Sequence, residues 1–428
     1  MKYFYFLFVF SFVAFNGFGQ LAPTNGVAES KANYYALQHV NVYVSAYEFI
    51  ENATVLIKGD KIEKIAKFIL LPDACVEIDM EGQTIVPAFI ELYSNIALPL
   101  PTNSSVGHRP QLETSKKGAY YWNEAIHPEL DAASLFKIDA KANENLMNMG
   151  FGFALTHVQD GIVRGSGALI SLGNEDVNKQ MIESNAGLFY SFSKGISNQT
   201  YPSSQMGSIA LLRQSLYDLI YYQQNKANND NSISMDAWSA KLKSPSFFKV
   251  DDKWEILRAN KIAQEFGLDL IYVASGNEYA NVNYLKKINP KLIVPINFPL
   301  AYNVQDPYLA RQIPLSELKH WELAPYNAKS LKENGLTVAL SSDGITVPAT
   351  FWKNIRKQIE IGLSVEQILE SLTDIPAKMI GKEALIGSLE AGKLASFSVF
   401  DGNPFTSESA ILEAWHLGER TVLKTPQK

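Results

Sequence analysis

Three residues of types that perform chemistry lie close together in the segment LTHVQDGIVRG, which follows an apolar run. They are His157, Asp160 and Arg164. Histidine and carboxylate side chains transfer protons, and a guanidinium binds anions through paired hydrogen bonds. We interpret this cluster as a candidate binding site. The alternative is a loop that hydrogen bonds and a salt bridge hold in place. A further candidate is Asp343 in LSSDG, which also follows an apolar run.

Several other chemistries find no support in the sequence. It contains no G-x-S-x-G nucleophile elbow, no phosphate-binding P-loop and no G-x-G-x-x-G dinucleotide motif. The only cysteine, Cys75, excludes an intrachain disulfide. A formal net charge of -6 without a Lys/Arg cluster argues against a nucleic-acid partner. With 46% hydrophobic residues the chain is a globular protein.

The elements that would position these residues are short apolar runs alternating with helical patterns. Such alternation predicts an α/β fold with a parallel sheet, and eight strands are the number that closes a (β/α)8 TIM-type barrel. A helix is expected over residues 254–266, ending at Gly267 as a C-cap. The expected strands are residues 85–92, 151–158, 168–172, 187–192, 246–250, 268–274, 291–296 and 336–342.

Both ends of the chain are rich in short β patterns, which predicts a small β-sandwich domain built from both termini. The very first residues have another pattern: Lys2 precedes an apolar run over 3–15 and a small-x-small site at 17–19. That layout is typical of a cleavable signal peptide, and the run is too short to span a membrane. We therefore expect an exported protein, periplasmic or extracellular. The expected organisation is a signal peptide (1–19), a linker (20–33), the sandwich (34–84 and 382–428) and the barrel (85–381).

Four segments in a fixed order resemble the amidohydrolase superfamily, in its imidazolonepropionase-like branch of metal-dependent hydrolases. They are NATVLIKGDKIEKI, PDACVEIDMEGQTIVPAFIELYSNI, LSSDG and SLTDIPAKMIGKEALIGSLEAGKLASFSVFDGNP. The resemblance implies a (β/α)8 barrel beside a sandwich made from both termini. It also implies zinc or another divalent metal at the barrel mouth, where the ion activates a water for attack on a carbon-nitrogen bond.

This sequence departs from the ligand pattern that the resemblance implies. The two histidine positions after the first strand hold Tyr93 and Asn95, and the strand-four segment GLFYSF has no Lys or Glu. The histidine positions on strands five and six fall at Lys249 and Ser275, and only Asp343 matches. One carboxylate does not hold zinc against water. We therefore expect no metal cofactor.

An aspartate left without its ion needs another positive charge nearby. We predict that Lys249 supplies this charge and pairs with Asp343. One alternative is that the Lys249 side chain extends to solvent instead. Another is a metal held elsewhere, by His157, His127 and Asp343.

Two functions remain open. The first is a non-catalytic protein that binds a small molecule or peptide at the mouth, or that pairs with itself or with a ligand-complete relative. Such a scaffold would fill its mouth with Tyr93, Phe189, Phe192 and the loop after the first strand. The second is a hydrolase of carbon-nitrogen bonds other than peptide bonds. It would use Asp343 as acid/base and Lys249 or His157 as electrostatic partner, and it would present an open polar mouth.

Overall fold

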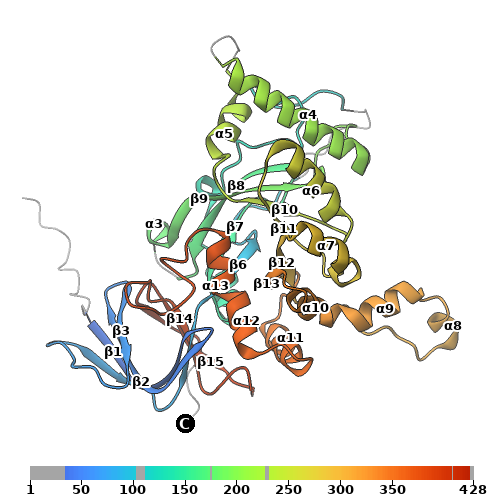
Figure 1. Cartoon of the computed structure of the whole chain (residues 1–428). Helices are drawn as coiled ribbons and strands as arrows, with labels where there is room; N and C mark the ends of the chain where they lie inside the picture. Colours follow the sequence, from blue (N-terminus) through green and yellow to red (C-terminus); the bar gives the residue numbers. More distant parts are fainter. Residues whose placement is uncertain (1–33, 103–110, 174–175, 227–230, 407, 425–428) are drawn as a thin grey trace, which may run out of the picture.

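The computed structural model describes residues 34–102, 111–173, 176–226, 231–406 and 408–424. The expected signal peptide and linker, residues 1–33, lie outside the described residues. Two β-sheets dominate the molecule, one built from the two ends of the chain and one at its centre (Figure 1). Within the described ranges, no helix has the length and apolar character needed to cross a membrane.

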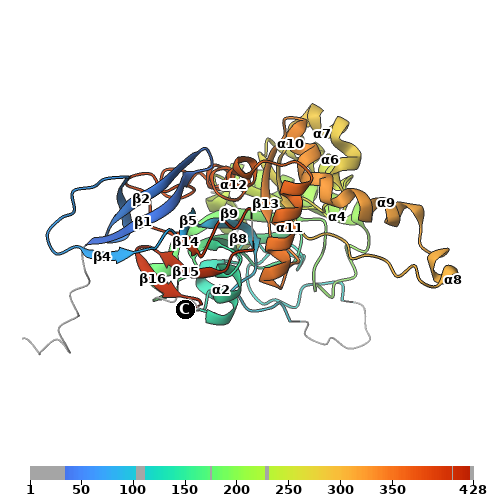
Figure 2. The ribbon, with the colours of Figure 1, turned by 90° about the horizontal axis from the view of Figure 1, so that it is seen from below.

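The first sheet combines strands from both ends of the chain. Strand β5 joins the two sets, because it pairs with β1 in parallel and with β14 in antiparallel fashion. Figure 2 shows these strands together on one side of the molecule. The strands are β1 (Tyr34–Ser45), β2 (Glu48–Lys58), β3 (Lys61–Ala66), β4 (Val76–Asp79), β5 (Thr84–Pro87), β14 (Phe397–Phe400), β15 (Ile411–His416) and β16 (Glu419–Val422). The composite sheet agrees with a domain built from both termini, while its two-layer sandwich form stays a prediction.

Alternation along β1 explains why this segment is a strand with one buried face. Val40, Val42 and Val44 are buried, and the residues between them are partly exposed. Successive side chains of a strand point to opposite faces, so the three valines face the same core. They pack with Phe397 and Trp415 from the C-terminal strands.

The second sheet holds the candidate site. Its eight strands run in the order β13-β12-β11-β10-β9-β8-β7-β6. They are β6 (Phe89–Ser94), β7 (Phe151–Thr156), β8 (Val163–Ser171), β9 (Met181–Ser191), β10 (Ser246–Lys249), β11 (Leu270–Val273), β12 (Lys291–Pro295) and β13 (Thr337–Ser341). Each predicted strand from 151 onward overlaps one of them. The predicted strand 85–92 is two strands instead, because the chain passes from β5 in one sheet to β6 in the other at Ala88.

The sheet curls around one apolar interior. All eight strands contribute a buried side chain to the same cluster, which includes Ile90 of β6, Phe189 of β9 and Ala339 of β13. In the described part of the chain no backbone pairing between β6 and β13 closes the sheet. The arrangement is a mixed α/β fold consistent with a TIM-type barrel, and full closure stays a prediction.

The sheet is not wholly parallel, which differs from the expected βα repeat. Strand β8 is antiparallel to both β7 and β9. Only residues 157–162 connect β7 to β8. A parallel crossover needs a dozen or more residues, so this connection permits only a hairpin.

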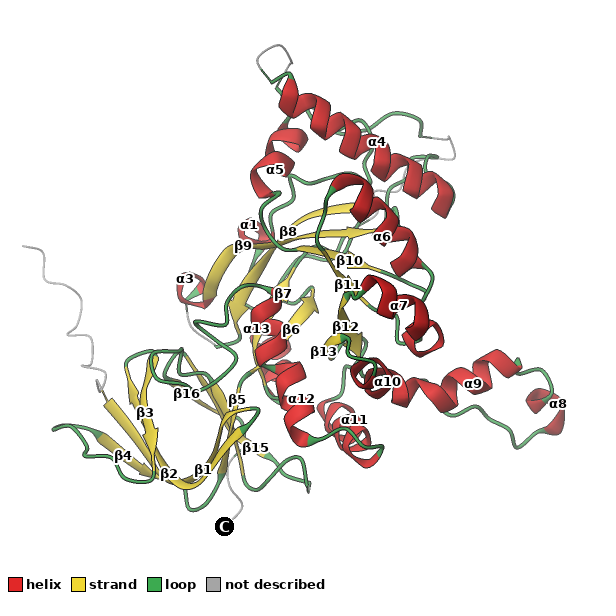
Figure 3. Cartoon of the chain, in the orientation of Figure 1, coloured by secondary structure: helices red, strands yellow, loops and turns green. Residues whose placement is uncertain are grey.

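Helices lie around the second sheet, and two of them, α8 (Pro307–Ala310) and α9 (Leu315–Leu323), extend away from it as an arm (Figure 3). Helix α6 begins at Glu255 and ends at Phe266, with Gly267 as a left-handed C-cap, as predicted. The others are α1 (Ala132–Leu135), α2 (Ala140–Met147), α3 (Val177–Gln180), α4 (Gln205–Gln224), α5 (Ile233–Lys241), α7 (Val282–Ile288), α10 (Asn327–Glu333), α11 (Pro348–Glu360), α12 (Val365–Leu372) and α13 (Asp374–Met379), with 3-10 turns η1 (Glu278–Asn281) and η2 (Ala324–Tyr326).

Candidate functional site

Most of the residues singled out from the sequence lie at one edge of the second sheet. Tyr93 is near the end of β6, His157 directly follows β7, and Lys249 is the last residue of β10. Ser275 and Asp343 each stand two residues beyond the end of a strand, β11 and β13. The carboxyl ends of parallel strands meet at the same edge, which in barrels of this type is the mouth where active sites lie. Lys249 therefore ends the fifth strand of the sheet and Ser275 follows the sixth, which is the expected order.

An ion pair joins two of these residues. The Lys249 ammonium lies 3.3 Å from Oδ2 of Asp343, which is the pairing predicted from the sequence. The ammonium also lies 3.5 Å from the carbonyl of Ala274 and 5.2 Å from the centre of the Tyr93 ring. The Lys249 side chain is 18% exposed and that of Asp343 is 32% exposed. The ammonium thus stands beside the one carboxylate that matches the implied ligand pattern.

A pocket of about 250 Å³ opens between Asp343 and helix α2. Tyr93 and Asn95 line it from β6 and the loop that follows, and Gln159 lines it from the β7–β8 connection. Asn95 is exposed, whereas Tyr93 is buried. The walls are polar, and the carboxylates of Glu91 and Asp343 are both among them. This pocket is a suitable size for a small polar group.

A buried carboxylate that the sequence reasoning missed ties the first strand of the sheet to the last. Glu91 of β6 is 1% exposed. Its Oε1 accepts from the backbone N–H of Tyr93 and from the hydroxyl of Ser341, and its Oε2 accepts from the N–H and hydroxyl of Ser342. Burial raises the pKa of Glu91, and these hydrogen bonds oppose the increase. The available signal was an acidic residue inside the apolar run IVPAFIEL.

Aromatic rings fill the interior beneath the mouth. The His157 ring stacks on Phe189 with centroids 3.5 Å apart, and Phe189 stacks on Phe247 at 4.8 Å. The Tyr93 ring also contacts His157, with the two ring centroids 5.0 Å apart. Neither ring nitrogen of His157 makes a hydrogen bond within the described residues. Burial lowers the pKa of His157 well below its ordinary value and the nearby Arg164 charge adds to this, while the Ser94 carbonyl opposes it only in part.

Asp160 and Arg164 do not form the salt bridge that the sequence suggested as an alternative. Asp160 accepts a hydrogen bond from the backbone N–H of Ile196, 2.8 Å away, and its backbone carbonyl lies 2.8 Å from Nε2 of His127. Arg164 bonds to the carbonyl of Gly161 and, through Nη1, to the hydroxyl of Tyr93. Both residues are buried. Although they are four positions apart in sequence, Asp160 bonds to the loop at Ile196 and Arg164 bonds to Tyr93 of β6.

Ser275 belongs to a second buried carboxylate network. Its hydroxyl and backbone N–H bond to Oε1 of Glu278, which is fully buried, and Asn327 donates to the other oxygen of that carboxylate. A pocket of about 140 Å³ adjoins Ser275, with Asn297 and His320 among its walls. Glu278 was also missed by the sequence reasoning. These contacts hold the loop after β11 rather than present a metal ligand.

The donor set at the mouth does not fit a divalent metal. An ammonium cannot coordinate a cation, and amide and phenol groups are poor zinc ligands. Among the residues that the structure describes, no group of three or more His, Cys, Asp and Glu side chains is placed to hold a metal ion. The alternative set of His157, His127 and Asp343 is therefore not brought together. His127 bonds to the Asp160 carbonyl instead, and His157 is enclosed by rings.

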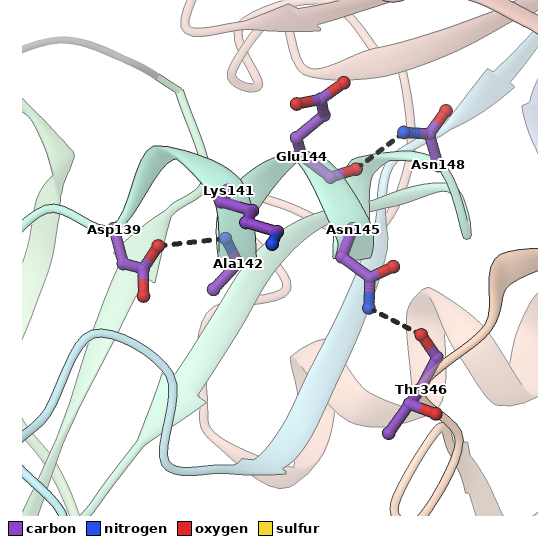
Figure 4. A pocket seen from close by; sticks show the side chains of 7 residues that line it. All are labelled: Asp139, Lys141, Ala142, Glu144, Asn145, Asn148 and Thr346. Carbon is purple, nitrogen blue, oxygen red and sulfur yellow. Dashed lines mark hydrogen bonds between the residues drawn. The ribbon is translucent and has the colours of Figure 1, made fainter.

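A separate pocket of about 520 Å³ lies along helix α2, outside the mouth. Figure 4 shows its lining, in which Asp139 caps the helix and the Asn145 amide donates to the carbonyl of Thr346. Asn145 also lines the mouth pocket, so this hydrogen bond lies where the two spaces meet. None of the residues predicted for the site lines the outer pocket.

Comparison with known proteins agrees with this fold. A model of the amidohydrolase family matches residues 265–422, the C-terminal part of the chain. The structure of an amidohydrolase from Thermotoga maritima MSB8 superimposes with a TM-score of 0.72 and 23% identity, covering 90% of this chain and 99% of that one. A prolidase complexed with N-methylphosphonate-L-proline gives 0.53 and 14%, covering 91% and 99%.

A β-aspartyl dipeptidase from Fervidobacterium islandicum AW-1 gives a TM-score of 0.53 at 15% identity, covering 91% of this chain and 97% of that one. No curated protein matches the sequence. At these identities the likeness shows that the chain has the fold of amidohydrolases, and a shared fold does not establish a shared activity.

Proposed function

We propose that this protein is an exported member of the amidohydrolase family that has lost the family's metal centre and binds a small molecule or peptide at the mouth of its barrel. The partial family match and the fold likeness over 90% of the chain support membership. Pairing with a second copy or with a ligand-complete relative is compatible with this role. Nothing in the charge of the chain favours nucleic acid.

The observation that carries the proposal is the ion pair between Lys249 and Asp343. A divalent ion bound to Asp343 would have to displace an ammonium 3.3 Å away. Two positive groups competing for one carboxylate repel each other, and the lysine is anchored by the Ala274 carbonyl and the Tyr93 ring. The lysine therefore supplies the charge that a metal would otherwise supply. Tyr93 and Phe189 fill the interior beneath the mouth, as expected of a scaffold, whereas Phe192 packs against Phe248 in a different apolar cluster. The mouth itself keeps a pocket of about 250 Å³.

The test is the metal content of the mature protein, purified without tags or chelators from cells grown with zinc, manganese and iron. Elemental mass spectrometry should find metal well below one equivalent per chain. Lys249→His replaces the ammonium by an imidazole beside Asp343, and it should bind zinc at least tenfold more tightly than the wild type. Lys141→His, at an exposed position of α2, is the matched control and should show no gain. Near-stoichiometric metal in the wild type would refute the proposal.

Export is tested separately. Cell fractionation should place the protein outside the cytoplasm, and the mature N-terminus should be Gln20. An intact Met1 in the purified protein would contradict this part of the proposal.

A second candidate function is hydrolysis of carbon-nitrogen bonds other than peptide bonds with an altered site. It is favoured by one observation, the partly exposed Asp343 carboxylate on the wall of the mouth pocket. His157 is a poor partner for it because the ring is fully buried and held neutral. Hydrolysis of amide or lactam substrates that Asp343→Asn abolishes would favour this function over simple binding.

A further inference from the structure

The mouth pocket is the first of three pockets that follow one another along helix α2. It shares Ala142 and Asn145 with the outer pocket, which shares Asn148 with a third pocket of about 330 Å³. The third pocket is lined by the start of α11, by the segment that leads into β15 and by Lys424. We call the three pockets together the α2 groove. It runs from Asp343 at the mouth to Lys424.

Two asparagine side chains present free acceptors to the α2 groove. They are Asn145 of α2 and Asn148, the C-cap of this helix. The Asn145 amide donates to the carbonyl of Thr346 and the Asn148 amide donates to that of Glu144, at 3.2 and 2.9 Å (Figure 4). Among the described residues, neither Oδ1 atom accepts a hydrogen bond, and both asparagines are partly exposed. A ligand with N–H donors can therefore bond to both without breaking an existing contact.

The spacing of these two acceptors suits an extended peptide. Residues three apart on a helix have Cβ atoms about 5–6 Å apart. In an extended chain, the N–H groups that point to one side belong to alternate residues and repeat about every 6.7 Å. Rotation about the side-chain bonds of the asparagines covers the difference of about 1 Å.

The length of the α2 groove accommodates several peptide residues. From Lys141 to Asn148 the helix rises about 10 Å, and a pocket continues at either end. At about 3.3 Å per residue, about five residues of extended peptide span this distance. In the third pocket, Pro348, Trp352 and Ile411 form an apolar wall, which fits an apolar side chain of the ligand.

The charges and rings of the α2 groove argue against other polymers. Charged side chains of both signs line it, namely the carboxylates of Glu91, Asp139, Glu144 and Asp343 and the ammonium groups of Lys141 and Lys424. Such a lining does not suit a polyanion. The aromatic rings among the walls, Tyr93 and Trp352, are 6% and 7% exposed, so they offer no open face to a sugar ring.

We infer that the α2 groove binds an extended peptide of about five residues through its backbone, an inference that rests on the proposed binding role of the mouth and names its ligand. Asn145 and Asn148 accept hydrogen bonds from the N–H groups of alternate peptide residues. One end of the peptide lies in the mouth beside the side-chain amides of Asn95 and Gln159, and the other places an apolar side chain against Trp352. In this mode main-chain hydrogen bonds supply affinity and the end pockets supply specificity.

The experiment uses the full mature protein in EDTA, so that bound metal plays no part, and measures binding by calorimetry and ligand-observed NMR. The probes are acetyl-Leu-Ala-Ala-Ala-Leu-amide, the same pentapeptide methylated at every backbone amide nitrogen, acetyl-Leu-Ala-amide and the oligosaccharide maltopentaose. Blocked ends and an apolar residue at each end let the pentapeptide bind in either direction. We expect one site per chain, with the pentapeptide bound at least tenfold more tightly than each other probe.

Variants of the two asparagines test the contacts directly. Asn145→Leu and Asn148→Leu should each weaken pentapeptide binding about fivefold, as expected for the loss of one hydrogen bond. Asn225→Leu is the matched control, because Asn225 is the C-cap of α4 and its amide donates to the carbonyl of Tyr221, four residues earlier, at the same 2.9 Å. This control should bind the pentapeptide as the wild type does.

The outcomes separate this inference from the proposed function. Equal binding of the methylated pentapeptide, tighter binding of maltopentaose, no pentapeptide binding, or unchanged binding by the Asn145 and Asn148 variants would each overturn the inference. Asn95 lines only the mouth pocket of the three. If Asn95→Leu weakens acetyl-Leu-Ala-amide and the pentapeptide binds no more tightly than that probe, the mouth binds a ligand and the inference alone fails. Near-stoichiometric metal in the untreated protein would instead count against the proposed function alone.

Discussion

The ion pair at the mouth should be measurable as a coupling energy between Lys249 and Asp343. At 3.3 Å, two unit charges attract by about 1.3 kcal/mol in water and about 5 kcal/mol at the effective dielectric constant of a protein surface. Both side chains keep some solvent contact, and removing them from water costs part of that attraction. We expect a net coupling of about 1–2 kcal/mol, above the value of about 0.2–1 kcal/mol typical of exposed pairs.

The assay is a double-mutant cycle of Lys249→Met and Asp343→Asn, with the free energy of unfolding taken from urea titrations. The control cycle uses Lys291 and Asp269, which are closer, at 2.8 Å, but 45% and 82% exposed. That pair should couple by less than about 0.5 kcal/mol. The mouth coupling should persist in about 1 M salt better than the control, since partly buried pairs are screened less. Equal coupling for the two pairs, or none at the mouth, would refute our reasoning.

Three further outcomes are expected from unfolding measurements. Glu91→Gln replaces one carboxylate oxygen by an NH₂ group, which then faces the backbone N–H of Ser342 or of Tyr93. The free energy of unfolding should fall by about 2–3 kcal/mol, because one of these donors loses its acceptor. A change below about 0.5 kcal/mol would contradict the role of Glu91 as an acceptor. Burial lowers the pKa of His416 from 6.5 to about 4 in the folded protein, so as the pH falls the unfolded chain protonates this histidine before the folded protein does. The free energy of unfolding should therefore fall by about 3 kcal/mol from pH 6.5 to pH 4. His416→Leu should remove that part of the pH dependence. Leu300→Ser, in the segment that leads into α8, and Tyr308→Ser, within α8, change side chains that are 89% and 78% exposed. Each should change the free energy of unfolding by less than about 0.5 kcal/mol, measured as a small shift of the thermal midpoint; a larger loss would mean that the side chain is packed against something.

Strand positions and strand ends were predictable from the sequence because they depend on local patterns. Apolar runs of strand length located the elements from β7 to β13. The order of segments placed Lys249 at the end of the fifth strand and Ser275 directly after the sixth. The reversal of β8 was also within reach, since residues 157–162 are too few for a crossover. A βα repeat favours parallel strands, so only the length of this connection indicates the reversal.

The buried polar groups were not predictable in the same way. In the sequence, Glu91 is one acidic residue in an apolar strand. Its hydrogen-bond partners Ser341 and Ser342 lie about 250 residues later, at the end of β13, and only the fold brings them to it. Glu278 likewise depends on Asn327, far along the chain. Such contacts join segments that are far apart along the chain, whereas the periodicity of a single sequence describes only residues that are close together along it.

Arg164 shows most clearly why charges at a site must be counted in pairs. Its spacing from Asp160 favours a local salt bridge. The structure gives the Asp160 carboxylate to Ile196 and leaves the guanidinium with neutral partners. Asp160 and Arg164 thus lie four residues apart and both are buried, yet they have different partners. Spacing along the chain can suggest which charged groups pair, but the three-dimensional contacts decide it.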